Sequence, residues 1–470
     1  MSWCLISRRD VLRAAATGAL ISTMATCKDG DPPLLGTDGF VPGNTLPWTN
    51  WADTESCTPT LRVALEAESD VVDLLTRSPV PIRPVGASHS FSGLVPTSGT
   101  LIATDLLNGV ISTDPLTCQA EVWAGTRLHA LGPMLAEAGQ ALCNQPDIDY
   151  PSIGGATATA SHGTGLGFGS LSSYVIGLTL ATPSGDLIQC DRQRRPEVFS
   201  AARVSLGALG VVTRLKLQNE PALRLAEVTR VEPLEDVLDD LTSRFNSNRH
   251  FELLALPHTR LCVSVTTNEA KRTDIAHGVD DPQAVYKLRQ LYRLVSWLPG
   301  IADSTYESLL KAFMGDSAST VRVGQSFEVL AHPRIVRFRE MEYTVPAEAG
   351  AACLRDILRV IRETPIPVVF PIEFRRVDAD DIWLSPFQGG AGCAISIHQY
   401  SDTDYAPYFA AIEPIFWRYQ GRPHWGKLHT LDAQRFASLY PSWRDFQDVR
   451  RMLDPMGRML NPHLHKILGA

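Results

Sequence analysis

The stretch Arg83-Pro-Val-Gly86-Ala-Ser-His89-Ser90-Phe-Ser-Gly93 decides how this chain is interpreted. It continues a short apolar run that is typical of a strand, and Gly86 allows the backbone to turn sharply directly afterwards. The small side chains of Ala87, Ser88 and Ser90 leave the backbone N–H groups open, and successive open N–H groups bind anions. The stretch therefore predicts a phosphate-binding loop that carries one histidine, His89.

A second stretch of similar composition follows later in the chain: Ile153-Gly-Gly-Ala-Thr-Ala-Thr-Ala-Ser-His162-Gly-Thr-Gly165. Its glycines allow a ligand to approach the backbone closely, and its Thr and Ser side chains supply hydroxyl donors. Neither stretch has the spacing GxGxxG or GxxxxGK[ST], which argues against a doubly wound dinucleotide domain and against a P-loop. Each stretch alone could be a glycine-rich turn with an incidental histidine. The combination favours a chain that wraps a large phosphate-bearing cofactor.

The composition bounds the class of protein. A chain of 470 residues is too long for a single core, so we expect two domains. With 44% hydrophobic and 20% charged residues it is neither disordered nor fibrous. The net charge of −8 provides no basic field, so we expect no nucleic-acid partner. The nine cysteines form no CxxC pair and no cluster at zinc spacing, so we expect no metal and no disulfide framework.

The first residues have the pattern of an export signal. Ser7-Arg-Arg-Asp10 precedes an apolar run over residues 14–25, which is too short to span a membrane. The adjacent arginines predict the twin-arginine route, with a basic leader that has a chance arginine pair as the alternative. Cys27 ends a partial match to a lipoprotein cleavage site, so a lipid anchor there is a further hypothesis. We expect a signal over residues 1–27, a linker over 28–46, and a protein that is periplasmic or tethered to the outer side of the cytoplasmic membrane.

From Trp48 onward the hydrophobic pattern predicts an α+β fold. Strands are predicted over residues 81–85, 101–104, 119–124, 178–182, 187–190 and 211–217, and helices over residues 69–76 and 128–138. The pattern then changes character, with helices predicted over 234–245 and 284–313 and strands over 251–255, 261–266, 368–374 and 394–400. We expect this second block to cover one face of the cofactor.

In its two glycine-rich stretches, the chain resembles the vanillyl-alcohol-oxidase-type flavoproteins. Within that family it resembles the aldonolactone and alditol oxidase branch. The motifs most specific to that branch are Gly421-Arg-Pro-His-Trp-Gly-Lys427-Leu-His429 and Leu453-Asp-Pro-Met-Gly-Arg-Met-Leu-Asn-Pro462. The resemblance implies a two-domain FAD-binding fold with a substrate (cap) domain of sheet plus helices. We expect the FAD-binding domain over residues 47–222, the cap domain over 223–430, and a C-terminal segment over 431–470 that returns to the FAD domain.

The resemblance also implies the cofactor and its contacts. FAD would be covalently bonded through its 8α-methyl group to His89, and the second stretch would bind the pyrophosphate. The expected cofactor-binding residues are Gly86, Ala87, Ser88, His89, Ser90, Gly154, Gly155, Thr157, Ser161, His162, Gly163 and Val211.

Candidate catalytic residues lie in the second block. In Pro371-Ile-Glu373-Phe-Arg375 a period of two places Glu373 and Arg375 on one face of a strand, either as a solvated salt bridge or as a pair that grips substrate oxygens. His398 alternates with isoleucines, so it is either a satisfied core histidine or a substrate-side residue. Lys427 matches the lysine of the His-Trp-Gly-Lys motif. Asp380-Asp381 is interpreted as a turn and not as a metal site.

The resemblance implies oxidation of a CH–OH group of a sugar-derived aldonolactone or a polyol by hydride transfer to flavin N5. Lys427 or His398 would take the hydroxyl proton, Arg375 would stabilise developing negative charge, and Glu373 would orient a neighbouring hydroxyl. By resemblance, Pro146 falls at the position that controls oxygen access, which favours O2 as acceptor and H2O2 as product. Ser152 either contacts substrate or caps a loop. The alternatives are a dehydrogenase that passes electrons to a quinone or cytochrome, and a non-catalytic sugar-binding relative.

Overall fold

The computed structural model describes residues 46–271, 275–277, 284–295, 302–314, 319–333, 335–364 and 366–470. The expected signal and nearly all of the expected linker lie outside this range. Within it, no helix has the length and apolar character needed to cross a membrane. All described residues belong to one compact unit, so the expected domain boundaries at residues 222 and 430 stay predictions.

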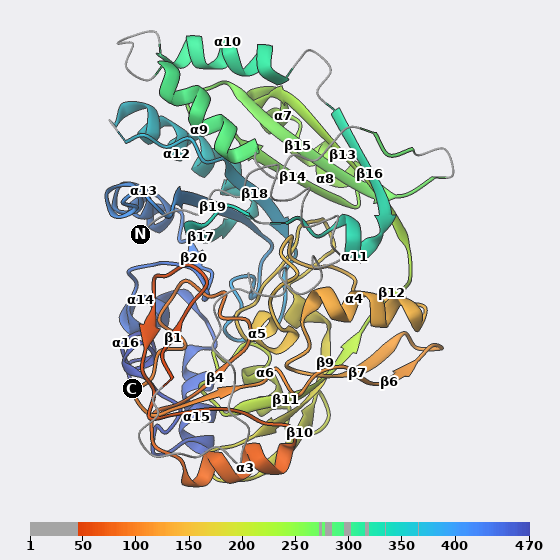
Figure 1. Cartoon of the computed structure of the whole chain (residues 1–470), viewed down its shortest axis with the longest axis vertical. Helices are drawn as coiled ribbons and strands as arrows, with labels where there is room; N and C mark the ends of the chain where they lie inside the picture. Colours follow the sequence, from red (N-terminus) through yellow and green to blue (C-terminus); the bar gives the residue numbers. More distant parts are fainter. Residues whose placement is uncertain are drawn as a thin grey trace, which may run out of the picture. The chain divides into compact units, whose positions relative to one another are not determined.

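Two sheets build the part of the unit that carries both glycine-rich stretches (Figure 1). A parallel sheet has the order β3 (Leu61–Ala64), β5 (Thr100–Ala103), β4 (Ile82–Val85). An antiparallel sheet has the order β10 (Leu187–Asp191), β9 (Val175–Ala181), β11 (Val211–Gln218), β7 (Gln119–Trp123), β6 (Val110–Asp114). Helices α3 (Glu68–Arg77), α4 (Leu128–Glu137), α5 (Ile153–Ala158) and α6 (Pro196–Ala202) connect these strands. Two short pairs, β1 (Trp48–Thr49) with β2 (Ser56–Cys57) and β8 (Gln140–Ala141) with β12 (Glu220–Pro221), complete this part.

The second part is one antiparallel sheet of eight strands. Its order is β16 (Ser319–Gln325), β13 (Arg224–Pro233), β15 (Leu261–Glu269), β14 (His250–Ala255), β18 (Ile372–Val377), β19 (Gly392–Tyr400), β17 (Phe338–Pro346), β20 (Arg422–Pro423). The helices around this sheet are α7 (Leu234–Asp239), α8 (Leu241–Ser247), α9 (Ala284–Val295), α10 (Ala302–Met314), α11 (Ser326–Val329), α12 (Gly350–Glu363) and α13 (Ala406–Arg418). The last helices are α14 (Ala433–Leu439), α15 (Trp443–Leu453) and α16 (Pro462–Leu468) (Figure 1). They return the chain to its first part, where α15 contacts α6 and Ile82 N of β4 donates to Arg458 O at 2.8 Å.

The strand β19 shows why the sheet can carry a polar site. All nine of its residues are buried, because helices cover one face and the first part of the chain covers the other. Ile395 and Ile397 join the hydrophobic core, where α12 contributes Leu354, Ile357 and Ile361 at helical spacing. With a period of two, Ser396 and His398 point to the opposite face. That face is directed toward the two glycine-rich stretches.

The α+β class and most of the predicted elements are confirmed. Two predictions are wrong in their bounds. The predicted helix over residues 234–245 is two helices that meet at Asp240. The predicted strand over residues 368–374 begins only at Ile372, because Pro367 and Pro371 lack the N–H that a ladder needs. Part of the predicted helix over 284–313 lies outside the described residues.

A buried arginine of β4 joins segments that are far apart in sequence. Arg83 is 1% exposed, and its guanidinium donates to the carbonyl oxygens of Leu94 (2.7 Å), Leu206 (2.5 Å), Gly207 (2.8 Å) and Met459 (2.7 Å). Burial lowers the pKa of Arg83 to about 9. The sequence analysis did not single it out, although a charged residue between Ile82 and Val85 was the signal that could have found it.

We expect Arg83→Met to lower the free energy of unfolding by about 3 kcal/mol, because it removes the donor for four carbonyl oxygens. Chemical denaturation of the purified protein measures this loss. The control is Arg77→Met, at an exposed position in the last turn of α3, for which a change within about 0.5 kcal/mol is expected. Equal unfolding free energies for the two variants would contradict the role assigned to Arg83.

Candidate active site

A cleft lies where the glycine-rich stretches face the eight-stranded sheet. It encloses about 1570 Å3 of empty space, with its open mouth included. The predicted residues that line it are Gly86, Ala87, Ser88, His89, Ser90, Pro146, Ser152, Gly154, Gly155, Ser161, His162, Val211, Glu373, Arg375, His398 and Lys427. The structure therefore brings the cofactor-side and the substrate-side predictions into one cavity.

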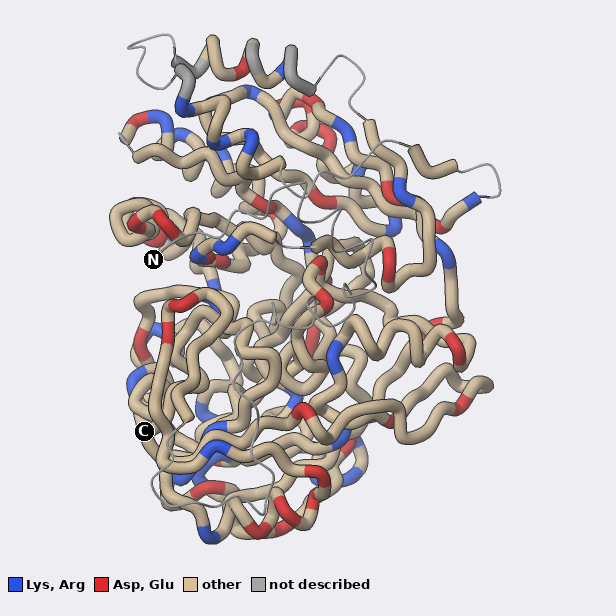
Figure 2. Tube along the Cα trace, viewed as in Figure 1, with Lys and Arg blue, Asp and Glu red and all other residues tan. Residues whose placement is uncertain are grey.

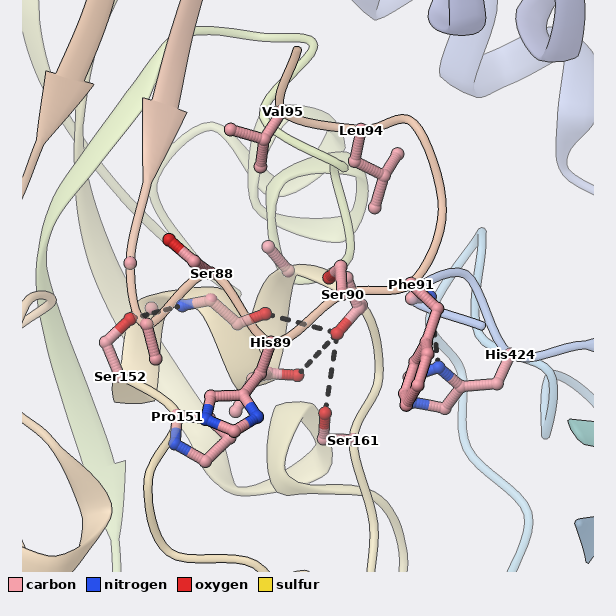
Figure 3. A pocket seen from close by; sticks show the side chains of 18 of the residues that line it. Ser88, His89, Ser90, Phe91, Leu94, Val95, Pro151, Ser152, Ser161 and His424 are labelled. Carbon is pink, nitrogen blue, oxygen red and sulfur yellow. Dashed lines mark hydrogen bonds between the residues drawn. The ribbon is translucent and has the colours of Figure 1, made fainter. Parts of the chain in front are cut away.

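The first stretch forms the loop expected after β4 (Figure 3). Ser88 has a positive φ of 61°, and its hydroxyl accepts a hydrogen bond from Trp48 Nε1 at 2.9 Å. The His89 ring stacks on Trp51 with the ring centroids 5.3 Å apart, and the Tyr150 ring lies 5.4 Å from it on centroids. A Cβ atom on Gly86 would lie 2.1 Å from Ser152 Oγ, so the two glycine-rich stretches meet where only a glycine fits.

The second stretch differs from the expected loop. Residues Ile153–Ala158 form the short helix α5, which begins after Ser152, whose hydroxyl accepts a hydrogen bond from Gly155 N at 3.3 Å. Ser152 thus caps a helix. It also lines the cleft, and its contact with substrate stays a prediction. Thr157 and Gly163 do not line the cleft. The Thr157 hydroxyl donates to Ile153 O at 2.9 Å, and a Cβ on Gly163 would lie 2.3 Å from Asn144 Oδ1.

The His-Trp-Gly-Lys motif is tied directly to the first loop. Phe91 N donates to Gly426 O at 2.6 Å, and the Ser92 hydroxyl donates to Trp425 O at 2.7 Å. These bonds position Lys427 beside the loop, with its ammonium 5.0 Å from the centroid of the Phe91 ring. The C-terminal motif therefore contributes a cation to the cleft that the first glycine-rich stretch lines.

Arg375 is buried at 7% exposure and surrounded by carboxylates. Its guanidinium lies 2.5 Å from Glu252, 3.3 Å from Asp147 and 3.4 Å from Glu373. Burial acts to lower the pKa of Arg375, but the carboxylates, Glu252 first, outweigh it and raise the pKa above its usual range. Glu373 and Arg375 form a salt bridge that is buried and faces the cleft, so the alternative of a solvated salt bridge is wrong, and the grip on substrate oxygens stays a prediction. The charge of Arg375 is already balanced by the protein.

The sequence analysis missed Glu340 and Glu342 of β17. They are 4% exposed and lie opposite His398 and Ser396 of β19 in the sheet register. Lys427 Nζ bonds Glu340 Oε2, and His398 Nε2 lies 3.5 Å from Glu340 Oε1. Burial acts to raise the pKa of Glu340, but the charges of Lys427 and His398 outweigh it and hold the pKa at about 2. Two glutamates at a period of two, with the apolar Met341 between them, were the available signal.

Glu342 forms a second pair with a histidine. Its carboxylate lies 2.8 Å from His162 Nε2 and accepts from the Ser396 hydroxyl at 2.7 Å. Burial acts to raise the pKa of Glu342, but His162 opposes it and the pKa is held well below the usual range. His424 is a further missed residue. Its Nδ1 accepts from Gly426 N at 3.0 Å and burial lowers its pKa to about 4, so this imidazole is neutral.

The cleft fits a dinucleotide with a flat ring system. The loop side of the cleft has open space and small side chains, and Gly86 permits a close approach there. The sheet side of the cleft carries charged side chains. The cationic side chains of the cleft other than histidines are Arg83, Arg375 and Lys427, and Arg83 is bonded to carbonyl oxygens. Phosphate groups would therefore be held by backbone N–H groups and hydroxyls of the loops, as expected for an anion nest.

Comparisons with known proteins also indicate a chain that binds a dinucleotide with a flat ring system. An FAD binding domain model matches residues 60–191, and the D-arabinono-1,4-lactone oxidase model matches residues 215–467. L-gulono-1,4-lactone dehydrogenase of Mycobacterium tuberculosis is 34% identical over 90% of this chain and 99% of its own length. L-gulonolactone oxidase of Bos taurus is 30% identical over 89% of this chain and 97% of its own length. Alditol oxidase of a Streptomyces species is 28% identical over 90% of this chain and 99% of its own length.

Among solved structures, cholesterol oxidase from B. sterolicum superimposes with a TM-score of 0.72 over 93% of this chain and 100% of its own length. At 17% identity this likeness shows the fold alone, the vanillyl-alcohol-oxidase-type fold. The chain is thus an FAD-dependent oxidoreductase of that fold. It belongs to the D-arabinono-1,4-lactone oxidase family.

We expect Gly86→Ala to reduce the amount of flavin that the purified protein carries. The new Cβ would overlap Ser152 Oγ and push apart the two stretches that line the cleft, at a cost of about 1–3 kcal/mol. Flavin absorbance per chain measures the effect. Gly390→Ala is the control, because a Cβ at Gly390 meets no atom within 4 Å. Full flavin content in Gly86→Ala would show that the loops adapt to the extra atom.

Proposed function

We propose that this chain oxidises a CH–OH group of an uncharged sugar lactone or polyol, with FAD covalently attached to His89 and O2 as the acceptor. The observation that carries the proposal is the single cleft that both glycine-rich stretches, Glu373, Arg375, His398 and Lys427 line. When bound, FAD supplies the hydride acceptor. The residues of the sheet then have to bind the hydroxyls, orient the reacting carbon and receive the hydroxyl proton.

The charges around the cleft favour an uncharged substrate. Five carboxylates lie on the sheet side or pair with its cations, namely Glu252, Glu340, Glu342, Glu373 and Asp147. The cations among them are Arg375 and Lys427, together with His162 and His398 when these are protonated. Even with both histidines charged, the group keeps one net negative charge. Among the described residues that line the cleft, a carboxylate substrate would meet repulsion and no unpaired Lys or Arg side chain, whereas hydroxyls find many acceptors.

We expect an aldono-1,4-lactone to reduce the flavin with a kcat/KM at least about tenfold higher than the open-chain aldonate of the same sugar, a difference of about 1.4 kcal/mol. Anaerobic bleaching of flavin absorbance in a stopped-flow instrument measures both. The neutral alditol of that sugar serves as the uncharged open-chain control, so that ring opening and charge are separated. Equal reduction by lactone and aldonate would contradict the electrostatic argument. No reduction by any of the three would favour the non-catalytic binding relative.

Support for His89 as the attachment site comes from its position. The ring lines the cleft on the loop after β4, and the rings of Trp51 and Tyr150 hold its orientation. We expect flavin fluorescence to stay with the wild-type chain after acid precipitation and washing, and to be lost from His89→Ala. His129→Ala is the control, because His129 is exposed and its ring lies 5.7 Å from that of Tyr150. Flavin retained by precipitated His89→Ala would exclude His89 as the link.

The acceptor is proposed from Pro146, which lines the cleft. The alternative is a quinone or cytochrome, and the relatives include both a dehydrogenase and oxidases. Reoxidation rates of the reduced protein with O2 and with a soluble quinone distinguish the two. We also propose export by a twin-arginine signal, with Cys27 as a lipid anchor. Fractionation of cells that express the Arg8→Lys/Arg9→Lys variant tests this proposal.

A further inference from the structure

One buried carboxylate contacts both side chains that are candidates to receive the substrate proton. Glu340 of β17 bonds Lys427 Nζ through Oε2 and faces His398 Nε2 through Oε1 at 3.5 Å. Glu340 is 4% exposed, as is His398, whereas the Lys427 side chain is 20% exposed. The three groups therefore form a cluster in which Lys427 is the most exposed to solvent.

Both ring nitrogens of His398 face acceptor oxygens. Its Nδ1 lies 3.3 Å from the carbonyl oxygen of Pro371, which can only accept, so Nδ1 carries a hydrogen. Its Nε2 faces the Glu340 carboxylate, which also accepts when ionised. An imidazolium satisfies both acceptors, whereas a neutral imidazole satisfies only one. As long as Glu340 is ionised, the geometry favours a protonated His398.

The surroundings strengthen this charge pairing. The Phe370 ring stacks on His398 with centroids 4.9 Å apart, and the Phe338 ring meets it edge-on at 5.0 Å. Apolar rings keep water away, and charges interact more strongly where water is excluded. The other charged or titratable groups on this wall of the cleft are Glu342 from β17, Glu373 and Arg375 from β18, and, beyond them, His162 and His424. Arg375 is balanced by its own carboxylates, and Glu342 is paired with His162.

We propose that Glu340 is a positioning residue that keeps Lys427 and His398 protonated at neutral pH and so sets the pH at which the site gains a proton acceptor. Oxidation needs one of the two in its neutral form, after loss of its own proton to solvent. The substrate O–H proton then passes to that nitrogen, the C–H bond breaks with its electron pair leaving as hydride to FAD, and a C=O bond forms. This inference rests on the proposed function.

Glu340→Gln tests the proposal, because it removes the charge and nearly keeps the shape. Loss of a neighbouring negative charge lowers the pKa of both cations. We therefore expect the rising limb of the pH profile for anaerobic flavin reduction to move to lower pH by about one unit or more, which is tenfold or more in the ionisation constant. Glu340→Asp keeps the charge and is expected to restore the profile close to that of the wild type.

The matched control is Glu413→Gln. Glu413 of α13 is also a buried carboxylate at 2% exposure, but it is bonded to the Tyr343 hydroxyl at 2.6 Å and to Thr430, on the other face of the sheet. Its loss should lower stability without moving the pH profile. The thermal midpoint of each variant shows whether it is folded.

A second readout needs neither substrate nor turnover. In the flavin-loaded protein labelled with 15N-histidine, the His398 imidazole signals, assigned with His398→Gln, should titrate at lower pH in Glu340→Gln than in the wild type. An unchanged His398 titration together with an unchanged pH profile would overturn the proposal, as would an equal shift in Glu413→Gln. If no lactone or polyol reduces the wild-type flavin, the proposed function fails, while the histidine titration still decides the role of Glu340.

Discussion

The cleft depends on the hydrogen bonds of one buried guanidinium. Arg83 donates to carbonyl oxygens of the loop after β4, of the loop before β11, and of the segment before α16. A carbonyl buried without a donor costs about 1–3 kcal/mol, so the three segments are stable together only around this cation. The loop that carries His89 begins three residues after Arg83. Its position relative to the C-terminal motif is therefore fixed from within the core.

The side of the cleft that the eight-stranded sheet forms depends on a different constraint, the pairing of buried charges. Strands β14, β18, β19 and β17 lie side by side and direct acids and bases toward one face. A buried charge is tolerated when a partner is in reach, and here each cation has a carboxylate from a neighbouring strand or loop. The sheet thus presents hydrogen-bonding groups to a ligand without presenting an unbalanced cation.

The sequence predicted what depends on local spacing. Period two placed Glu373 and Arg375 on one face, and small residues after an apolar run predicted the His89 loop. The spacing of residues along the chain does not reveal the order of the strands in a sheet. Glu252 of β14 and Asp147 therefore could not be recognised as partners of Arg375. The glycines of the second stretch favour a loop, yet Ile153–Ala158 is helical and is capped by the Ser152 hydroxyl. The run from Val368 to Pro371 is apolar enough for a strand, but Pro367 and Pro371 lack the N–H group that a sheet ladder needs, so the strand begins at Ile372.

Three buried histidines in one cleft have different partners at their ring nitrogens. His424 accepts from a backbone N–H and is neutral, whereas both nitrogens of His162 and of His398 face acceptors. The two acceptor carboxylates, Glu340 and Glu342, sit at alternate positions of a single strand. The carboxylate partners of His162, His398 and Lys427 are therefore supplied by β17, a strand that lies outside the sequence motifs. Substitutions in β17 would change the field in the cleft while every residue of the recognised motifs stayed in place.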